Sequence, residues 1–133
     1  MKNSLQIFSI PLFFTIISKP LAAASFSEQD CRNMGAVFHD AVKAKTLLAL
    51  FGESADRQKN RHQKLRPDLQ ESVAIAISGI DPAIEALVAP LRSKIPEWNR
   101  RGMNGNELAK QVLMRASGDA RNSFTTSCLR EIR

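Results

Sequence analysis

Apolar residues recur at intervals of three and four along most of this 133-residue chain, the spacing that gathers them on one face of an α-helix. The first stripe follows Ser27, whose hydroxyl suits a helix N-cap. The acidic residues after it would lie in the first turn, where the helix dipole favours negative charge. The stripe consists of Cys31, Met34, Phe38, Ala41 and Val42. Two continuations fit the sequence: one helix over residues 28–51 that ends at Gly52, or a break near Lys45 and a second helix capped by Thr46.

Pro67 is expected to open the next helix, since proline is well tolerated at the first helical position, and Gly79 is expected to end it. Its apolar positions are Leu69, Val73, Ala76, Ile77 and Ile80. Residues 72–78 also alternate between β-branched and small side chains, which fits a strand. The alanines and the continuation of the helical spacing to Leu69 and Ile80 favour a helix.

Asp81 and Pro82 predict the start of the next helix, with Asp81 as its N-cap and Pro82 as its first residue. The stripe that follows them consists of Ile84, Leu87, Val88 and Leu91. Pro90 and Pro96 fall within the same segment, and each removes a backbone hydrogen bond from a helix. We therefore expect this helix to be short or bent.

Asn104 and Glu107 stand three residues apart, the spacing of a capping box, and predict the start of another helix. Gly118 predicts its end, and a last helix then carries an apolar residue at every fourth position. The buried positions of these two helices are Leu108, Val112, Leu113, Ala120, Phe124, Cys128 and Ile132. Few aromatic and many aliphatic residues suit helices packed through their faces. The sequence thus predicts an all-α fold, a small bundle of four to six helices.

An apolar run at residues 5–17, with Lys2 before it and three alanines after it, has the organisation of a secretory signal peptide. This run is too short to cross a bilayer core, which takes about 20 residues of helix. We expect cleavage after Ala24, so that residues 1–24 are the signal peptide and residues 25–133 form one helical domain. The protein is then periplasmic or secreted, with no stable membrane insertion after cleavage. The alternative is an uncleaved membrane anchor.

Cys31 and Cys128 are the only cysteines, and one stands near each end of the expected mature chain. In an oxidising compartment such a pair most simply forms one structural disulfide, which would join the first helix to the last. A bridge across so long a loop stabilises a domain by about 4 to 5 kcal/mol on the chain-entropy model. The alternative is a catalytic Cys31 thiolate with His39 or His62 as its base, which requires an unpaired sulfur.

Basic residues gather in two segments, and we predict that they form a surface that binds an acidic partner. The predicted basic surface consists of Arg57, Lys59, Arg61, Lys64, Arg66, Trp98, Arg100 and Arg101. His62 also lies in the first segment, and Arg92 and Lys94 belong to the second. The alternatives are a merely solvated face and, for Trp98, partial burial against the core. Loss of residues 1–24 lowers the formal charge from +6 to +4, because two lysines and no acids leave with them.

The sequence contains none of the common motifs for zinc hydrolysis, serine nucleophiles, phosphate loops or paired redox cysteines. The two histidines do not have the spacing of metal ligands. We therefore expect no enzymatic activity and no catalytic residues, metal or cofactor. Nucleic acid is not an expected partner, since an exported domain with one tryptophan and no tyrosine offers no stacking platform.

The predicted signal peptide, size, helices and terminal cysteine pair resemble, in architecture, two groups of small exported bacterial proteins. One comprises helical immunity proteins that neutralise cell-wall-degrading toxins, and the other comprises acid-stress periplasmic chaperones with one disulfide. The leading hypothesis is an exported binding protein, such as an inhibitor or immunity protein, whose partner is another exported or envelope protein. A stress chaperone and a cysteine-dependent enzyme are the alternatives, and the oligomeric state stays open.

Overall fold

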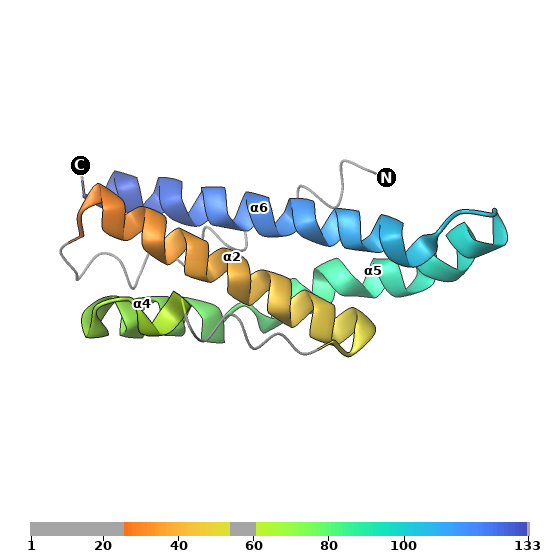
Figure 1. Cartoon of the computed structure of the whole chain (residues 1–133), viewed down its shortest axis with the longest axis horizontal. Coiled ribbons are helices and arrows are strands. Elements are labelled where there is room, and N and C mark those ends of the chain that lie inside the picture. Colours follow the sequence, from red (N-terminus) through yellow and green to blue (C-terminus); the bar gives the residue numbers. More distant parts are fainter. Residues whose placement is uncertain (1–25, 54–60, 133) are drawn as a thin grey trace.

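A computed structural model describes residues 26–53 and 61–132 of the chain. These residues form four long helices and no strand: α2 (Glu28–Phe51), α4 (Pro67–Ser78), α5 (Asp81–Arg100) and α6 (Gly105–Glu131) (Figure 1). The predicted all-α fold is therefore confirmed. The expected signal peptide, residues 1–24, lies outside the described residues.

The two longest helices, α2 and α6, run antiparallel side by side and form the most extensive helix pair in the described chain (Figure 1). Cys31 is bonded to Cys128 at one end of this pair, and Glu53 is ion-paired with Lys110 at the other. Helix α5 packs against both α2 and α6, while α4 packs against α2. The side of the α2/α6 pair that faces α4 and α5 therefore holds the core.

The core is mostly aliphatic, with one aromatic contact at its centre. The rings of Phe38 in α2 and Phe124 in α6 lie 5.0 Å apart between centroids, and both side chains are buried. Around them pack buried residues from all four helices, including Met34, Val42, Leu69, Val73, Ile84, Leu87, Val88, Leu91 and Leu113. Burying such side chains supplies the main stabilisation of a helical array, because the isolated helices are marginal in water.

Helix α2 is continuous, so the one-helix continuation over residues 28–51 is correct. Ser27 caps it as predicted: its side chain accepts a hydrogen bond from the Asp30 backbone, and the Asp30 carboxylate accepts one from the Ser27 backbone. Thr46 does not cap a second helix, since its hydroxyl donates to the Val42 carbonyl within α2 at 2.8 Å. Gly52 ends the helix with φ at 70°, a conformation that favours glycine.

Residues 72–78 belong to α4, which decides between the helix and strand alternatives in favour of the helix. Pro67 stands at its start and Gly79 at its end, as predicted. Only one face is buried, at Leu69, Val73 and Ala76. These positions follow the helical spacing rather than the alternation of a half-buried strand.

Helix α5 differs from its prediction in two respects. It begins at Asp81 with Ile80 as its N-cap, and the Asp81 carboxylate accepts a hydrogen bond from Lys45 at 2.6 Å instead of capping the helix. It is also not short, because its 20 residues run through both Pro90 and Pro96. Both prolines lie on the exposed side of the helix, where water can satisfy the freed carbonyls while the opposite face stays packed in the core.

Helix α6 begins where it was predicted to begin, with the Glu107 backbone donating to the Asn104 side chain at 3.2 Å. The predicted break at Gly118 is wrong, since the helix continues through this residue for a total of 27 residues. Apolar residues on both sides of Gly118, such as Leu113 and Phe124, are buried in the same core. A mid-helix glycine costs only about 1 kcal/mol relative to alanine, less than this burial contributes.

The predicted disulfide is present and joins the first described helix to the last. Cys31 and Cys128 are 97 residues apart in sequence, their Cα atoms lie 5.5 Å apart, and both side chains are fully buried. Neither sulfur is a free thiol, so the nucleophile that the cysteine-enzyme hypothesis requires is not present in this state. A structural disulfide is consistent with an oxidising compartment.

None of the described helices is by itself both long and apolar enough to cross a bilayer. Helices α4 and α5 meet that limit only as a pair, with a bend of 47° at their junction.

Candidate docking groove between α2 and α6

The first segment of the predicted basic surface is largely engaged in contacts within the molecule. Arg61 lies with its Nε 3.2 Å from a carboxylate oxygen of Asp40 in α2. Arg66 bridges to two carboxylates, with Nη2 3.3 Å from Asp30 and Nε 3.4 Å from Asp68. Lys64 is exposed and has no ion pair within the described residues, and Arg57 and Lys59 lie outside them. The two arginines therefore secure the chain before α4 to the rest of the fold.

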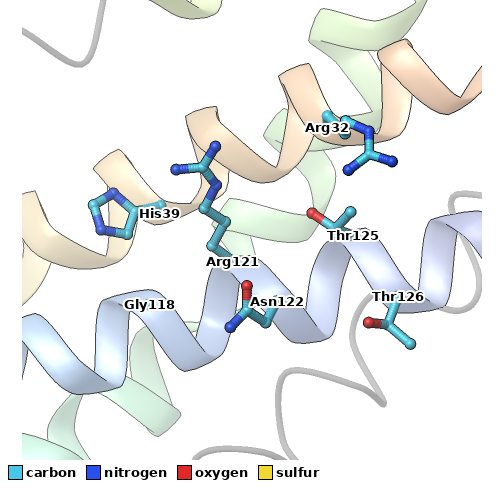
Figure 2. Close-up of a pocket in the computed structure, with 7 residues that line it drawn as sticks. All are labelled: Arg32, His39, Gly118, Arg121, Asn122, Thr125 and Thr126. Carbon is cyan, nitrogen blue, oxygen red and sulfur yellow. The ribbon is translucent and has the colours of Figure 1, made fainter.

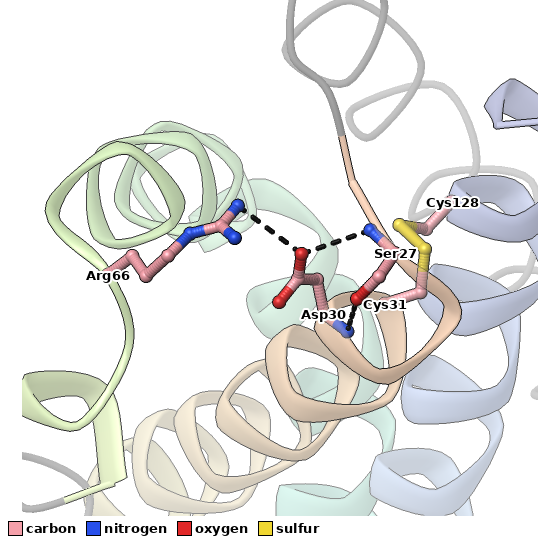
Figure 3. Close-up of a disulfide and its surroundings, with 5 residues drawn as sticks. All are labelled: Ser27, Asp30, Cys31, Arg66 and Cys128. Atoms are coloured by element: carbon pink, nitrogen blue, oxygen red, sulfur yellow. Dashed lines mark hydrogen bonds and ion pairs between the residues drawn. A yellow bond between two sulfur atoms is a disulfide. The ribbon is translucent and has the colours of Figure 1, made fainter.

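Arg66 completes a polar cluster beside the disulfide (Figure 3). The same Asp30 oxygen accepts a hydrogen bond from the Ser27 backbone at 3.0 Å and lies 3.3 Å from the Arg66 guanidinium. The Asp30 side chain is only 15% exposed, so this contact is partly shielded from water. Arg66 thus has a structural role at the start of α2, next to Cys31.

The second basic segment is also partly paired, in this case along α5. Arg92 donates to both carboxylate oxygens of Glu85 and to the Ala49 carbonyl at the end of α2. The hydrogen bond from Arg92 lowers the pKa of Glu85 and raises the pKa of Arg92. Arg101 pairs with Glu97 one helical turn away at 3.0 Å. These pairs stabilise α5 and its contact with α2.

Trp98 is half-buried and packs against the core, which matches the structural alternative rather than an exposed anchor. Arg100 is exposed near the end of α5. The two basic segments are also far apart, because Arg66 lies at the disulfide end of α6 and Arg101 precedes its other end. A 27-residue helix is about 40 Å long, so the predicted basic surface is not one patch.

A different basic site lies between α2 and α6, on the side away from α4 and α5 (Figure 2). It is a groove with a volume of about 540 Å³, which we call the α2/α6 groove. Its lining residues are Arg32, His39, Gly118, Arg121, Asn122, Thr125 and Thr126. Figure 2 shows the side chain of Arg121 extending from α6 across towards α2, with Arg32 and His39 on the facing helix.

Two glycines give the α2/α6 groove its shape. A Cβ atom on Gly35 would collide with the hydroxyl of Thr125 and lie 3.4 Å from the carbonyl oxygen of Arg121, so glycine at this position allows α2 and α6 to approach closely near the disulfide. At Gly118, by contrast, a Cβ atom would meet nothing within 4 Å. The missing side chain at Gly118 therefore leaves open space within the groove.

Arg32 and Arg121 differ from the arginines of the predicted basic surface in their surroundings. Neither has a carboxylate within ion-pair distance among residues 26–53 and 61–132, although both are exposed. The adjacent carboxylate of Asp40 is paired with His39 at 3.3 Å and with Arg61. Guanidinium groups flanked by amide and hydroxyl side chains are suited to hydrogen-bond an oxyanion such as a carboxylate.

A second, smaller hollow lies one helical turn further along α2 and α6, towards the Gly52 end of α2, and we count it as the second half of the α2/α6 groove. This hollow has a volume of about 130 Å³ and is lined by Lys43, Leu47, Glu53, Lys110, Leu113 and Met114. The lining residues of α2 lie seven, four and four positions apart, and Lys110, Met114, Gly118, Asn122 and Thr126 of α6 recur every four positions, so both hollows lie along one side of the helix pair. Met114 is 63% exposed, which makes this end of the groove the more apolar one.

This groove was not predicted from the sequence. His39 was considered only as a catalytic base or a metal ligand, and Arg32 and Arg121 are 89 positions apart without a shared motif. Their proximity depends on the register between α2 and α6, which the disulfide sets at one end. The pairing of Cys31 with Cys128 was the one signal that placed residues near 32 beside residues near 125.

Within the described residues, no group of three or more histidine, cysteine, aspartate or glutamate side chains is arranged to hold a metal ion. Searches of protein-family models, of curated proteins and of solved structures found no match to this chain.

Proposed function

We propose that this protein is a small exported, non-enzymatic binding protein that docks an acidic segment of another exported or envelope protein in the α2/α6 groove. The observation that carries the proposal is the pair of arginines, Arg32 and Arg121, which face this groove without a carboxylate partner in the described chain. Inhibition of that partner, as by an immunity protein, is one form that this binding would take.

The scaffold supports this proposal because it holds the two arginines on helices that are covalently joined. Cys31 precedes Arg32 by one residue, and Cys128 follows Thr125 and Thr126 within one turn of α6. A surface that is already ordered before binding loses less conformational entropy on association. Unpaired positive charge also accelerates encounter with a negatively charged partner and discriminates against basic ones.

A stress chaperone remains the second candidate, on one observation of its own. Four large apolar side chains are exposed on the described surface: Leu48, Ile75, Met103 and Met114. They lie on α2, α4, the turn before α6 and α6, so they do not form a single patch along one element. A chaperone of this kind would bind unfolded proteins through these residues rather than through Arg32 and Arg121.

A capture experiment with matched charge changes tests the proposal. The disulfide-bonded protein is immobilised and exposed to the envelope and secreted fractions of its own source. We expect a stoichiometric partner that is lost with the Arg32→Glu/Arg121→Glu variant and retained by the Lys64→Glu/Arg100→Glu variant, which changes the same charge elsewhere. Equal retention by both variants would contradict docking in the α2/α6 groove. Capture only of denatured proteins, sensitive to Ile75→Lys, would favour the chaperone.

A further inference from the structure

The geometry points to an acidic amphipathic helix of the partner as the occupant of the α2/α6 groove. Its carboxylates would lie against Arg32 and Arg121, and an apolar side chain of the same helix would pack on Leu47 and Met114. This inference rests on the proposed function and specifies the partner segment by its chemistry.

The form of the α2/α6 groove suits a helix. Two antiparallel helices present a groove on each side of the line along which they meet, and a third helix can pack into either. In this molecule, α5 already packs against both α2 and α6 on the core side. The α2/α6 groove is the equivalent packing site on the opposite side of the helix pair, and no described helix covers it (Figure 2).

The length of the groove also matches a helix. Arg32 and Leu47 mark the two ends of the lining on α2, and at 1.5 Å per residue they lie about 22 Å apart along the helix. A helix of about 15 residues spans that distance, whereas a single carboxylate or a small anion would leave most of the groove empty. Helices that lie in grooves of this kind are recognised through side chains at intervals of three, four and seven.

The chemistry of the lining changes along the groove. At the disulfide end, Arg32, Arg121 and the neighbouring amide and hydroxyl groups suit carboxylates. At the other end, Leu47 is half-buried, Met114 is exposed, and Lys110 is already paired with Glu53. A methionine surface adapts to apolar side chains of different shapes. Lys43 also lines this end, but a ligand with uniform negative charge would leave Leu47 and Met114 unmatched, whereas an amphipathic helix with acids at one end matches both.

Binding of a designed peptide tests this inference and does not require the natural partner to be identified. The probe is a fluorescein-labelled 18-residue helical peptide with one apolar stripe and two glutamates, four residues apart, at one end. The control peptide has lysines in place of the glutamates. Fluorescence anisotropy with the purified disulfide-bonded protein is expected to give a Kd for the acidic peptide at least tenfold below that of the control.

Variants of the protein then map the orientation of the peptide. Arg121→Glu and Met114→Lys lie in the two halves of the groove, and each is expected to weaken binding of the acidic peptide at least tenfold. Arg100→Glu and Ile75→Lys make the same chemical changes on other helices and are expected to leave the Kd unchanged. Circular dichroism and thiol titration verify that each variant is folded and disulfide-bonded.

Equal binding of the two peptides, or binding that is insensitive to Arg121→Glu and Met114→Lys, would overturn the inference. Either of two other occupants would also overturn it. One is a membrane surface, shown if phosphatidylglycerol vesicles, but neither peptide, bind the protein and Arg121→Glu and Met114→Lys weaken that binding. The other is a second copy of this chain, shown if sedimentation velocity detects a dimer that the same variants abolish. Should the captured envelope partner depend on Arg32 and Arg121 but not on Met114, while neither peptide binds, the proposed function stands and the helical occupant is wrong.

Discussion

At the scale of single residues, the α2/α6 pair depends on two glycines with opposite surroundings. Gly35 is buried where a Cβ atom would collide with the hydroxyl of Thr125. Gly118 has open space around it and lies in the middle of α6. The same substitution therefore has opposite consequences at these two positions of one helix pair.

We predict that Gly35→Ala lowers the free energy of unfolding by about 1 to 3 kcal/mol, the usual cost of overpacking a close helix contact. Gly118→Ala is the matched control and should raise it by up to about 1 kcal/mol, because alanine favours the helical backbone and meets no neighbour. Urea denaturation followed by circular dichroism measures both. Equal effects of the two changes would mean that α2 and α6 do not approach closely at Thr125.

At the scale of elements, helix starts depend on local hydrogen bonds, while helix continuity depends on packing. Ser27 and Asn104 cap α2 and α6, as the sequence predicted. The side chain of each accepts a hydrogen bond from the backbone three residues further along the chain. Pro90 was expected to shorten or bend its helix and Gly118 to end one, but α5 runs on through Pro90 and α6 through Gly118, since an apolar face is buried along each helix. Substitution of an N-cap residue should therefore change the stability of the protein by an amount that unfolding experiments can measure.

Ser27→Ala is predicted to destabilise the protein by about 1 kcal/mol, the typical cost of losing an N-cap side chain. The lost contact is the hydrogen bond from the Asp30 backbone, which leaves a backbone donor of the first turn unsatisfied. Thermal and urea unfolding of the two proteins measure the difference. Ser27→Asp should retain most of the stability, because a carboxylate can accept the same hydrogen bond, and a loss as large as that of alanine would argue against the cap.

At the scale of the whole molecule, the disulfide sets the register of the longest helix pair. It joins Cys31 to Cys128 across 97 residues and lies beside the Ser27, Asp30 and Arg66 cluster that holds the chain before α4 (Figure 3). Both ends of the described chain are thereby fixed at the same end of the molecule. The α2/α6 groove begins one residue after this crosslink, at Arg32.

The Cys31→Ala/Cys128→Ala variant is therefore expected to lose about 4 to 5 kcal/mol of stability on the chain-entropy model of crosslinks. The same variant should also weaken peptide binding, because the arginines would no longer be held in a common register. Urea denaturation with and without reductant measures the first effect, and intact-mass analysis verifies the bridge in the exported protein. Two reduced thiols in that material would contradict the structural role and restore Cys31 as a candidate nucleophile.

Much of this fold could be predicted from residues close together in sequence. The cap at Ser27, the start at Pro67 and the end at Gly52 depend on neighbouring backbone groups, and each appears where it was expected. The disulfide was predictable for a different reason, since a chain with two cysteines has only one possible intramolecular pair.

The candidate site was not predictable in this way, because it depends on residues that only the packed helices bring together. Arg61 and Arg66 were predicted to bind a partner, and the structure pairs them with Asp40 and Asp30 of α2. Arg32 and Arg121 carried no motif, yet the antiparallel register places them on one groove. Charge along a chain shows how many basic side chains exist, but the tertiary structure decides which of them an acid of the same molecule neutralises.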